Sequence, residues 1–237
     1  MSRGAGTSVR TVLVTGGTRG IGREIVRQLA PGWRVLVGGR DAAAVAGVVA
    51  DCPNAAGFVC DLADEDATAA AASALDRLDA IVHSAGVVTR GTAQEQTRAE
   101  WRRVLELNVV AVSHLTACAL PLLREARGQV VVLNSGAGFT SGAANGIYAA
   151  SKFAARAWTD ALRAEEQGRI RVSSVHPGRV DTDMQRALVA AEGGTYDAAS
   201  YLTPHAVARA VVAALEAPED ATHEVVSIRP SGVQQPR

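Results

Sequence analysis

A tyrosine and a lysine stand one helical turn apart in the second half of the chain. Tyr148 and Lys152 are four residues apart, and a loop of small residues at 136–146 precedes them. Residues four apart on a helix share one face, so the ammonium is expected to favour the phenolate and lower the tyrosine pKa. The pair makes Tyr148 a candidate general acid and base near neutral pH.

The lysine is set apart by its rarity. Of 24 basic residues, Lys152 is the only lysine. Arginine is planar, wider and harder to deprotonate, so a site that needs a compact cation with three donors resists the exchange made elsewhere. The alternative is an exposed helix lysine that happens to follow a tyrosine. An apolar run at 129–133 ends in Asn134 and Ser135, which places a hydroxyl before the same helix.

A glycine-rich turn at 16–22 predicts a dinucleotide site. It joins the β-branched run 9–15 to the amphipathic segment 23–29, which is the order of strand, turn and helix that such a site needs. Glycines permit positive φ and a close approach of the backbone to a pyrophosphate, while the helix N-terminus offers free N–H groups. Without its flanking segments, the same pattern would indicate only a structural turn.

The end of the next strand predicts the choice of cofactor. Gly39 and Arg40 stand where an NAD site commonly has a carboxylate for the ribose hydroxyls. Gly39 is expected to leave room, and Arg40 with Arg19 to bind a 2′-phosphate through charge-assisted hydrogen bonds. We therefore expect NADP(H) to be preferred over NAD(H).

Strand-like and helix-like segments alternate along the whole chain. Strands are expected at 9–15, 33–38, 58–62, 78–83, 129–133, 169–175 and 224–228. Helices are expected at 23–29, 42–50, 67–74, 97–123, 148–167 and 204–215. The pattern predicts one domain over 1–237, a Rossmann-type doubly wound parallel sheet of about seven strands with helices on both faces. Residues 183–203 are expected to cover an apolar pocket, and 231–237 to form a disordered tail.

Two polar residues need a separate reading. Asn108 lies inside an apolar helical segment, where asparagine is unfavourable, so a polar role is expected of it. His176 is an alternative catalytic base, but it precedes a Pro-Gly turn, and Tyr148 already has an activating partner.

Composition excludes several classes of function. With 48% hydrophobic residues, 20% charged residues, zero net charge and a pI near 7.0, the chain is expected to bind neither nucleic acid nor anionic membrane. Three cysteines without CxxC spacing suggest no disulfide framework and no zinc or other metal site, which fits a cytoplasmic protein. Neither a signal peptide in residues 1–10 nor a membrane span is expected.

Together these motifs resemble the single-domain type of the short-chain dehydrogenase/reductase family over residues 9–229. The matching motifs are TGxxxGxG at 15–22, Asp61, Ser84-Ala85-Gly86, Asn108, Ser135, YxxxK at 148–152 and PGxVxT at 177–182. Ser135 and Tyr148 are 13 residues apart, as in the family. The departures are His83-Ser84, where the family usually has two asparagines, and an ending at 228–230 without the usual two glycines.

The resemblance implies a role for each residue. Tyr148 would donate and accept the proton, Ser135 would orient the substrate oxygen, Lys152 would lower the phenol pKa and bind the nicotinamide ribose, and Asn108 would hold a water. The residues expected to bind the cofactor are Gly16, Thr18, Arg19, Gly20, Ile21, Gly22, Arg40, Asp61, Leu62, Ser84, Ala85, Gly86, Tyr148, Lys152, Pro177, Gly178, Val180 and Thr182.

The implied activity is reversible hydride transfer between NADPH and a small carbonyl compound or secondary alcohol. Helices 97–123 and 148–167, with Trp101 and Trp158, would pair across a two-fold axis in a homodimer or homotetramer.

A more specific activity, that of a 3-oxoacyl-[acyl-carrier-protein] reductase, stays open, with arginines at 124, 127, 169 and 171 as candidate contacts to the carrier. A non-catalytic NADP(H)-sensing regulator and a sugar-nucleotide epimerase or dehydratase are further alternatives. The regulator is disfavoured by the intact tyrosine and lysine, and the epimerase by the glycine spacing.

Overall fold

The protein is built around one parallel sheet, seen in a computed structural model that describes residues 9–231. The sheet has seven strands in the order β3-β2-β1-β4-β5-β6-β7, and every neighbouring pair is parallel. The strands are β1 (Thr11–Thr15), β2 (Arg34–Gly39), β3 (Ala55–Val59), β4 (Ala80–His83), β5 (Gln129–Leu133), β6 (Arg171–Pro177) and β7 (Val225–Ile228). The order reverses between β1 and β4, which is where open α/β sheets bind ligands.

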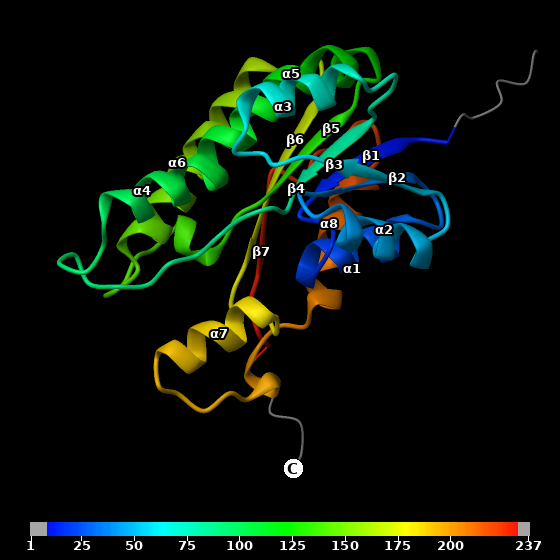
Figure 1. The fold of residues 1–237 in the computed structure, drawn as a ribbon. Helices are drawn as coiled ribbons and strands as arrows, with labels where there is room; N and C mark the ends of the chain where they lie inside the picture. The colour runs from blue at the N-terminus through cyan, green and yellow to red at the C-terminus, as the bar shows by residue number, and fades with distance from the viewer. Residues whose placement is uncertain (1–8, 232–237) are drawn as a thin grey trace, which may run out of the picture.

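Helices cover both faces of the sheet, as Figure 1 shows. One layer holds α1 (Gly20–Leu29), α2 (Ala42–Asp51) and α8 (Pro204–Leu215). The other holds α3 (Glu65–Ser73), α5 (Ala111–Glu125) and α6 (Gly146–Glu165), and α4 (Arg98–Leu105) leads into α5. Helix α7 (Asp183–Ala191) projects beyond the ends of β6 and β7. The predicted doubly wound, three-layer fold is confirmed.

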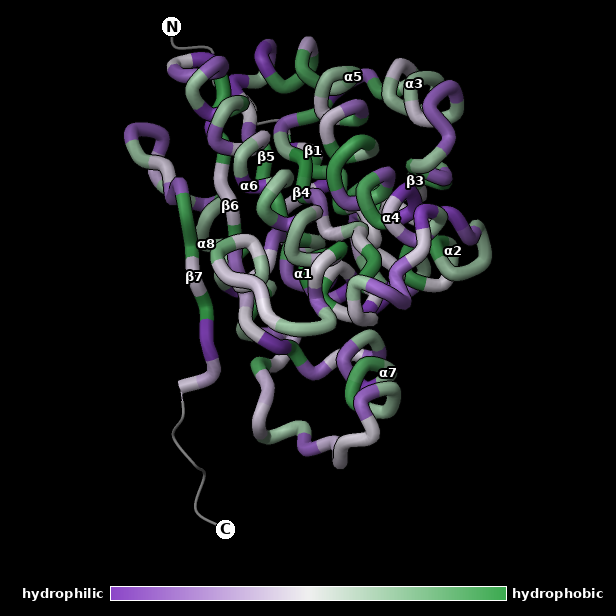
Figure 2. Tube along the Cα trace, turned by 90° about the vertical axis from the view of Figure 1, so that its left-hand side faces the viewer, coloured by the Kyte–Doolittle hydropathy of each residue, from purple (hydrophilic) through white to green (hydrophobic). Residues whose placement is uncertain are grey.

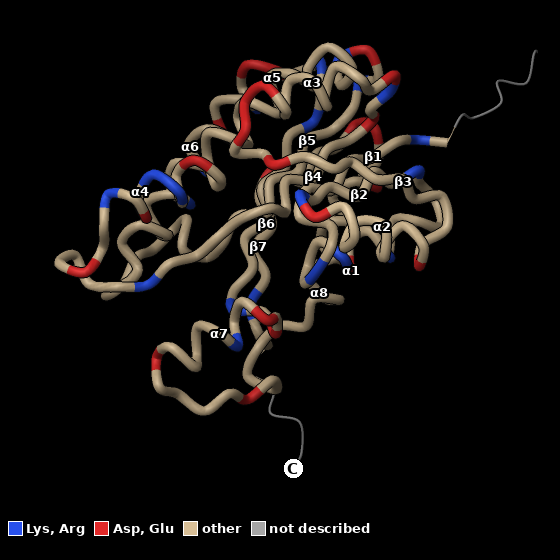
Figure 3. The backbone as a smooth tube through the Cα atoms, in the orientation of Figure 1, with Lys and Arg blue, Asp and Glu red and all other residues tan. Residues whose placement is uncertain are grey.

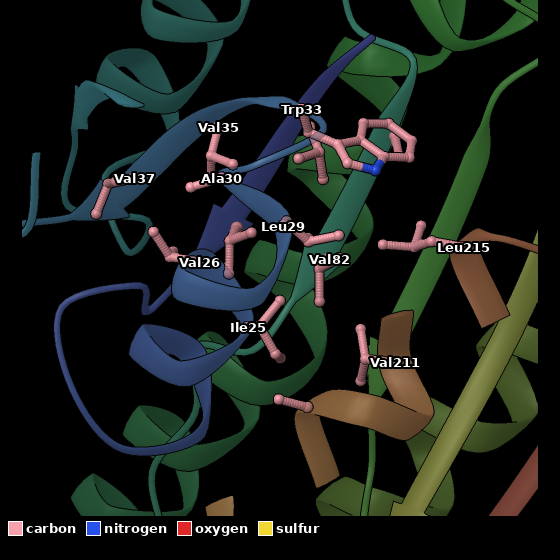
Figure 4. Packing of buried hydrophobic residues seen from close by; sticks show 14 of the residues in the cluster. Ile25, Val26, Leu29, Ala30, Trp33, Val35, Val37, Val82, Val211 and Leu215 are labelled. Atoms are coloured by element: carbon pink, nitrogen blue, oxygen red, sulfur yellow. The ribbon is translucent and has the colours of Figure 1, made fainter. Parts of the chain in front are cut away.

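Apolar side chains fill the space between the sheet and each helix layer. Figure 2 shows hydrophobic residues concentrated along the inner strands. Figure 3 shows most charged positions on the outer helices and loops. On one face of the sheet, Ile25 and Leu29 of α1 lie beside Val211 and Leu215 of α8, and all four are fully buried or nearly so (Figure 4). Both faces of the central strands are buried, and this explains why these strands are continuous apolar runs and do not alternate between apolar and polar residues.

Several boundaries differ from the sequence-based expectation. Strand β3 ends at Val59, so Asp61 lies beyond the strand instead of within it. Strand β6 extends to Pro177, so His176 lies inside the sheet and pairs with Ser227. The expected cover contains a regular helix, α7, and a 3₁₀ turn at 198–200. Residues 232–237 of the expected tail lie outside the described residues.

The long helix expected at 97–123 has an internal defect. Between α4 and α5 the backbone makes one π-helical turn, Glu106–Val110, in which the N–H of Ala111 donates to the carbonyl of Glu106. The whole run, Arg98–Glu125, is long and apolar enough to cross a membrane, which corrects the expectation that no segment approaches that length. Its buried residues Leu115 and Leu123 belong to the apolar core on the face of the sheet that α3 and α6 also cover, as expected for a core helix.

One buried histidine joins the sheet to this helix. The ring Nε2 of His83, at the end of β4, lies 2.8 Å from Thr116 Oγ1 on α5. The Thr116 hydroxyl donates its hydrogen to the Val112 carbonyl, so His83 Nε2 must be the donor to Thr116. Burial lowers the pKa of His83 from 6.5 to about 3, so the ring is neutral at physiological pH.

This histidine makes stability depend on pH. Its folded-state pKa lies below the unfolded value, so unfolding takes up a proton and stability falls as pH drops below about 6.5. His83→Gln keeps a donor near Nε2 without the titration. Urea unfolding measures the free energy of unfolding at pH 7 and at pH 5. Between these pH values the unmutated protein should lose roughly 1–2 kcal/mol more of this free energy than the variant. Parallel losses in the two proteins would contradict the assignment.

Candidate active site

A cavity of about 510 Å³ opens at the carboxyl edge of the sheet. Its walls come from the segments that follow β1, β4, β5 and β6, and from α6 and α7. The sequence-predicted residues that line it are Ile21, Ser84, Gly86, Ser135, Tyr148, Lys152, Pro177, Gly178, Val180 and Thr182. Parallel strands bring these distant segments together because their carboxyl ends share one edge.

Ser135 and Tyr148 meet in this cavity. Ser135 follows β5 in an extended conformation, and its Oγ accepts a hydrogen bond from Ala137 N at 3.1 Å. Tyr148 lies in the first turn of α6 and lines the cavity together with Ser135, whose side chain is close enough to influence the pKa of the phenol. The two predicted hydroxyl residues therefore lie together in one cavity.

His176 holds the backbone of Ser135 and does not act as a base. Its ring is fully buried, with Nδ1 3.0 Å from the Ser135 carbonyl and Nε2 2.7 Å from Ser174 Oγ. A carbonyl only accepts, so Nδ1 carries the proton and a neutral Nε2 accepts from the serine hydroxyl. Burial is the main cause that lowers the pKa of His176, which keeps it neutral. The ring holds the backbone of Ser135 in place.

The Tyr148 phenol is protonated at neutral pH in this structure. Burial raises the pKa of Tyr148 above 10.0, and the hydrogen bond with Ser135 and the positive charge of Arg90 offset this only in part. The sequence-based expectation that Lys152 brings the phenol toward ionisation is therefore not met by the protein alone. A protonated phenol is the form that can donate a proton to a substrate oxygen.

Lys152 lies below the tyrosine ring and is almost completely buried. Its Nζ is 5.8 Å from the centroid of the Tyr148 ring and donates to the Leu133 carbonyl at 3.1 Å. Burial lowers the pKa of Lys152 from 10.5 to about 8, so the ammonium is mostly charged at pH 7. The exposed-lysine alternative is wrong, because only 7% of the residue is accessible.

Asn108 lies in the π-helical turn and clamps two parts of the site. Its Oδ1 accepts from Val87 N, and its Nδ2 donates to Val87 O, both at 2.9 Å. The second Nδ2 hydrogen goes to Ser151 Oγ at 3.0 Å. The polar role expected of this residue is confirmed. Only one lone pair of Oδ1 is left for the water that the resemblance implies.

The glycine turn forms a cradle suited to a dinucleotide. Gly16 has φ +63°, and a Cβ there would lie 2.8 Å from Ala85 Cα. A Cβ on Gly22 would overlap the Gly16 carbonyl oxygen, so the two segments meet by backbone alone. Helix α1 has no side-chain cap at its N-terminus, whereas α2, α3, α4, α7 and α8 have one. Its first N–H groups thus remain available to a pyrophosphate, and the residues present fit the predicted cofactor.

Gly39 has a packing role in addition to the one expected from the sequence. A Cβ there would lie 2.8 Å from Thr18 Cγ2 and 2.9 Å from Val45 Cγ2, so packing requires this glycine. Arg40 has a side chain 80% exposed, with one weak ion pair to Asp61 at 4.0 Å, and Arg19 is exposed at the start of α1.

Other predicted cofactor residues lie outside the cavity wall. These are Gly16, Thr18, Arg19, Gly20, Gly22, Arg40, Asp61, Leu62 and Ala85. They follow β1, β2, β3 and β4, at the same edge of the sheet as the cavity.

Several polar residues of the cavity were missed by sequence reasoning, among them an arginine, an asparagine and a glutamine. Arg90 follows β4, Asn145 precedes α6, and Gln185 lies in α7. None belongs to a motif, and Arg90 is one of many arginines. The only available signal was their closeness to predicted segments, and that does not single out a residue.

Residues 10–193 of the chain match the protein family described as "short chain dehydrogenase". It is 35% identical over 228 residues to dehydrogenase/reductase SDR family member 7B of Bos taurus, covering 86% of this chain and 70% of that protein. It is 34% identical over 197 residues to L-fucose dehydrogenase of Bos taurus, covering 80% and 73%. A solved protein from Beutenbergia cavernae, assigned as an NAD(P)-dependent gluconate 5-dehydrogenase with bound NADP, is 31% identical with a TM-score of 0.83, covering 93% and 95%.

Proposed function

This chain belongs to the short-chain dehydrogenase family and is an oxidoreductase, and on that premise we propose that it transfers hydride reversibly between NADP(H) and a carbonyl compound or secondary alcohol. The observation that carries the proposal is the meeting of Ser135, Tyr148 and Lys152 in one cavity of about 510 Å³, close to the uncapped N-terminus of α1.

Each residue of the site has a chemical task in this proposal. The bound nicotinamide supplies or accepts the hydride. In reduction the protonated Tyr148 gives its proton to the substrate oxygen, and in oxidation it takes one back. Ser135 orients that oxygen by hydrogen bonding. Lys152 adds a buried positive charge near the phenolate that each reduction leaves behind.

The alternatives draw less support. Arg127, Arg169 and Arg171 lie at the amino ends of β5 and β6, opposite the cavity, and Arg124 is bound to Glu166 at 2.6 Å. The arginines considered for an acyl-carrier protein are therefore at the wrong edge of the sheet. A non-catalytic sensor would not require the assembled pair of Ser135 and Tyr148.

The first test of the function compares Tyr148→Phe and Lys152→Arg with the unmutated enzyme. A panel of ketones, aldehydes and acyl thioesters provides a responsive substrate, followed by NADPH absorbance. Tyr148→Phe should lose on the order of 10²–10⁴-fold in kcat because the transferable proton is gone. NADPH binding should change little. Lys152→Arg should also lose most activity, because a wide guanidinium does not fit the buried position of a compact ammonium.

Circular dichroism checks that both variants fold. Full turnover by Lys152→Arg would contradict the special role of the only lysine. Full turnover by Tyr148→Phe would contradict the mechanism itself.

We propose NADP(H) as the preferred cofactor because Arg19 and Arg40 are exposed at the glycine turn and at the end of β2. The solved Beutenbergia cavernae relative also binds NADP.

Removing either guanidinium by substitution with alanine should weaken NADPH binding by about 10–100-fold and leave NADH binding nearly unchanged. Fluorescence titration measures both, and Arg27→Ala, an exposed change on α1, is the control. Equal dissociation constants for NADPH and NADH in the unmutated protein would contradict the preference. Gly39→Asp is unsuitable here because it would disturb the contact with Thr18.

We also propose that the chain forms at least a homodimer, through α4 and α6. Trp101 on α4, Val110 in the π turn that follows α4, and Phe153 on α6 are large apolar residues that are 36–50% exposed. Trp158, also expected at this surface, is partly buried and packs against the internal core.

Sedimentation at micromolar concentration tests this interface. Phe153→Glu should shift the protein toward monomer, because a charge cannot be buried there without a partner. Val59→Glu, at an equally exposed position on β3 away from these helices, should not. A monomeric unmutated protein would rule out the assembly.

The cytoplasm is our proposed location. Cys52, Cys60 and Cys118 are free thiols, and the first two are buried. Such thiols suit a reducing compartment.

A further inference from the structure

The cavity contains polar atoms that the protein itself does not satisfy. Within residues 9–231, three buried side-chain atoms have no hydrogen-bond partner: Arg90 Nε, Asn145 Oδ1 and Gln185 Nε2. All three residues line the cavity. Buried polar groups are nearly always paired, so their gathering at one place points to a ligand that pairs with them.

Arg90 is the charged member of this group, and its charge is not balanced. Its Nη2 lies 3.3 Å from Glu192 Oε1. The same carboxylate accepts from Arg179 Nη2 at 3.2 and 3.1 Å. Two guanidiniums therefore share one carboxylate, which leaves a net positive charge at the mouth of the cavity. Figure 3 shows basic and acidic positions gathered between α7 and the ends of β6 and β7.

The ion pair between Glu192 and Arg90 is weak. It is the residue that follows α7, where the carbonyl end of the helix dipole disfavours a negative charge. Its side chain is 37% exposed, so water competes for the carboxylate. An incoming anion can therefore replace it at low cost.

The chemistry of Arg90 selects the kind of anion. The Nε–H and one Nη–H of a guanidinium are parallel and match the two oxygens of a carboxylate. In Arg90 the Nε is unpartnered and Nη2 meets only a shared carboxylate. Arg90 and Tyr148 line the same cavity, so a molecule whose oxygen reaches the phenol can present a carboxylate to Arg90.

We propose that Arg90 binds a carboxylate on the substrate in place of Glu192, so that the enzyme acts on oxo acids and the corresponding hydroxy acids. This inference rests on the proposed function and names its substrate class. Arg90 is a specificity-determining residue, whereas Tyr148 acts on the carbonyl at the other end of the molecule. Asn145 Oδ1 offers an acceptor to a hydroxyl on the same substrate.

The test uses linear oxo acids with one to four methylene groups between carbonyl and carboxylate, each paired with its primary amide. The amide has the same shape without the charge. For at least one length, the unmutated enzyme with NADPH should have a kcat/KM for the acid about 10–100-fold above that for the amide. In Arg90→Gln this ratio should fall to near one.

Glu192→Gln gives a change of the opposite sign. Removing the competing carboxylate should raise the acid-to-amide ratio several-fold above that of the unmutated enzyme. A residue that merely latched α7 in place would not produce this increase. Arg27→Gln, on the exposed side of α1, is the matched control and should leave the ratio unchanged.

The outcomes separate this inference from the proposed function. Tyr148-dependent turnover of amides and other neutral carbonyls without an acid preference, or a preference that survives Arg90→Gln, would overturn the inference alone. Absence of turnover for every carbonyl would overturn the proposed function. In that case calorimetry of acid and amide binding to the NADPH complex decides the inference: charge-dependent binding that Arg90→Gln abolishes supports it, and equal binding overturns it.

Discussion

Parallel pairing of β1, β4, β5 and β6 is the constraint on which the site depends. Each of these strands must return to the starting edge through a helix, so the residues that follow them emerge at one common edge. Ser84, Ser135 and Pro177 are 51 and 42 residues apart in sequence order, yet all three line one cavity. The helices that make the return also bury both faces of the sheet.

Polar side chains inside the fold hold this edge in place. His176 fixes the carbonyl of Ser135, Asn108 fixes the backbone of Val87, and His83 fixes β4 to α5. Each lies within a strand or helix and reaches a neighbouring segment, so a loop after one strand is held by the element beside it. Because these groups are buried and paired, displacing one leaves an unsatisfied partner, which costs more than the bond itself.

Local patterns in the sequence predicted the fold and the core of the site. Apolar runs located the strands, and Gly16, Gly22, Ser135 and Tyr148 were recognisable because their spacing reflects a short-range geometry. Properties set by distant residues were not predictable. The raised pKa of Tyr148 comes from burial, and the need for glycine at position 39 comes from side chains of two other segments. Arg90 resembled every other arginine until the fold placed its Nε in a cavity.

The π-helical turn at Glu106–Val110 has a consequence for how this chain can change its length. Such a turn is an α-helix with one residue inserted, and each residue rotates the helix by about 100°. Deleting one residue here would restore a regular helix but turn α4 relative to α5 by that angle. Asn108 would then leave Val87, and the apolar side of α4 would face a new direction. The number of residues in this helix is therefore as strictly constrained as their identity, although the helix lies outside the cavity wall.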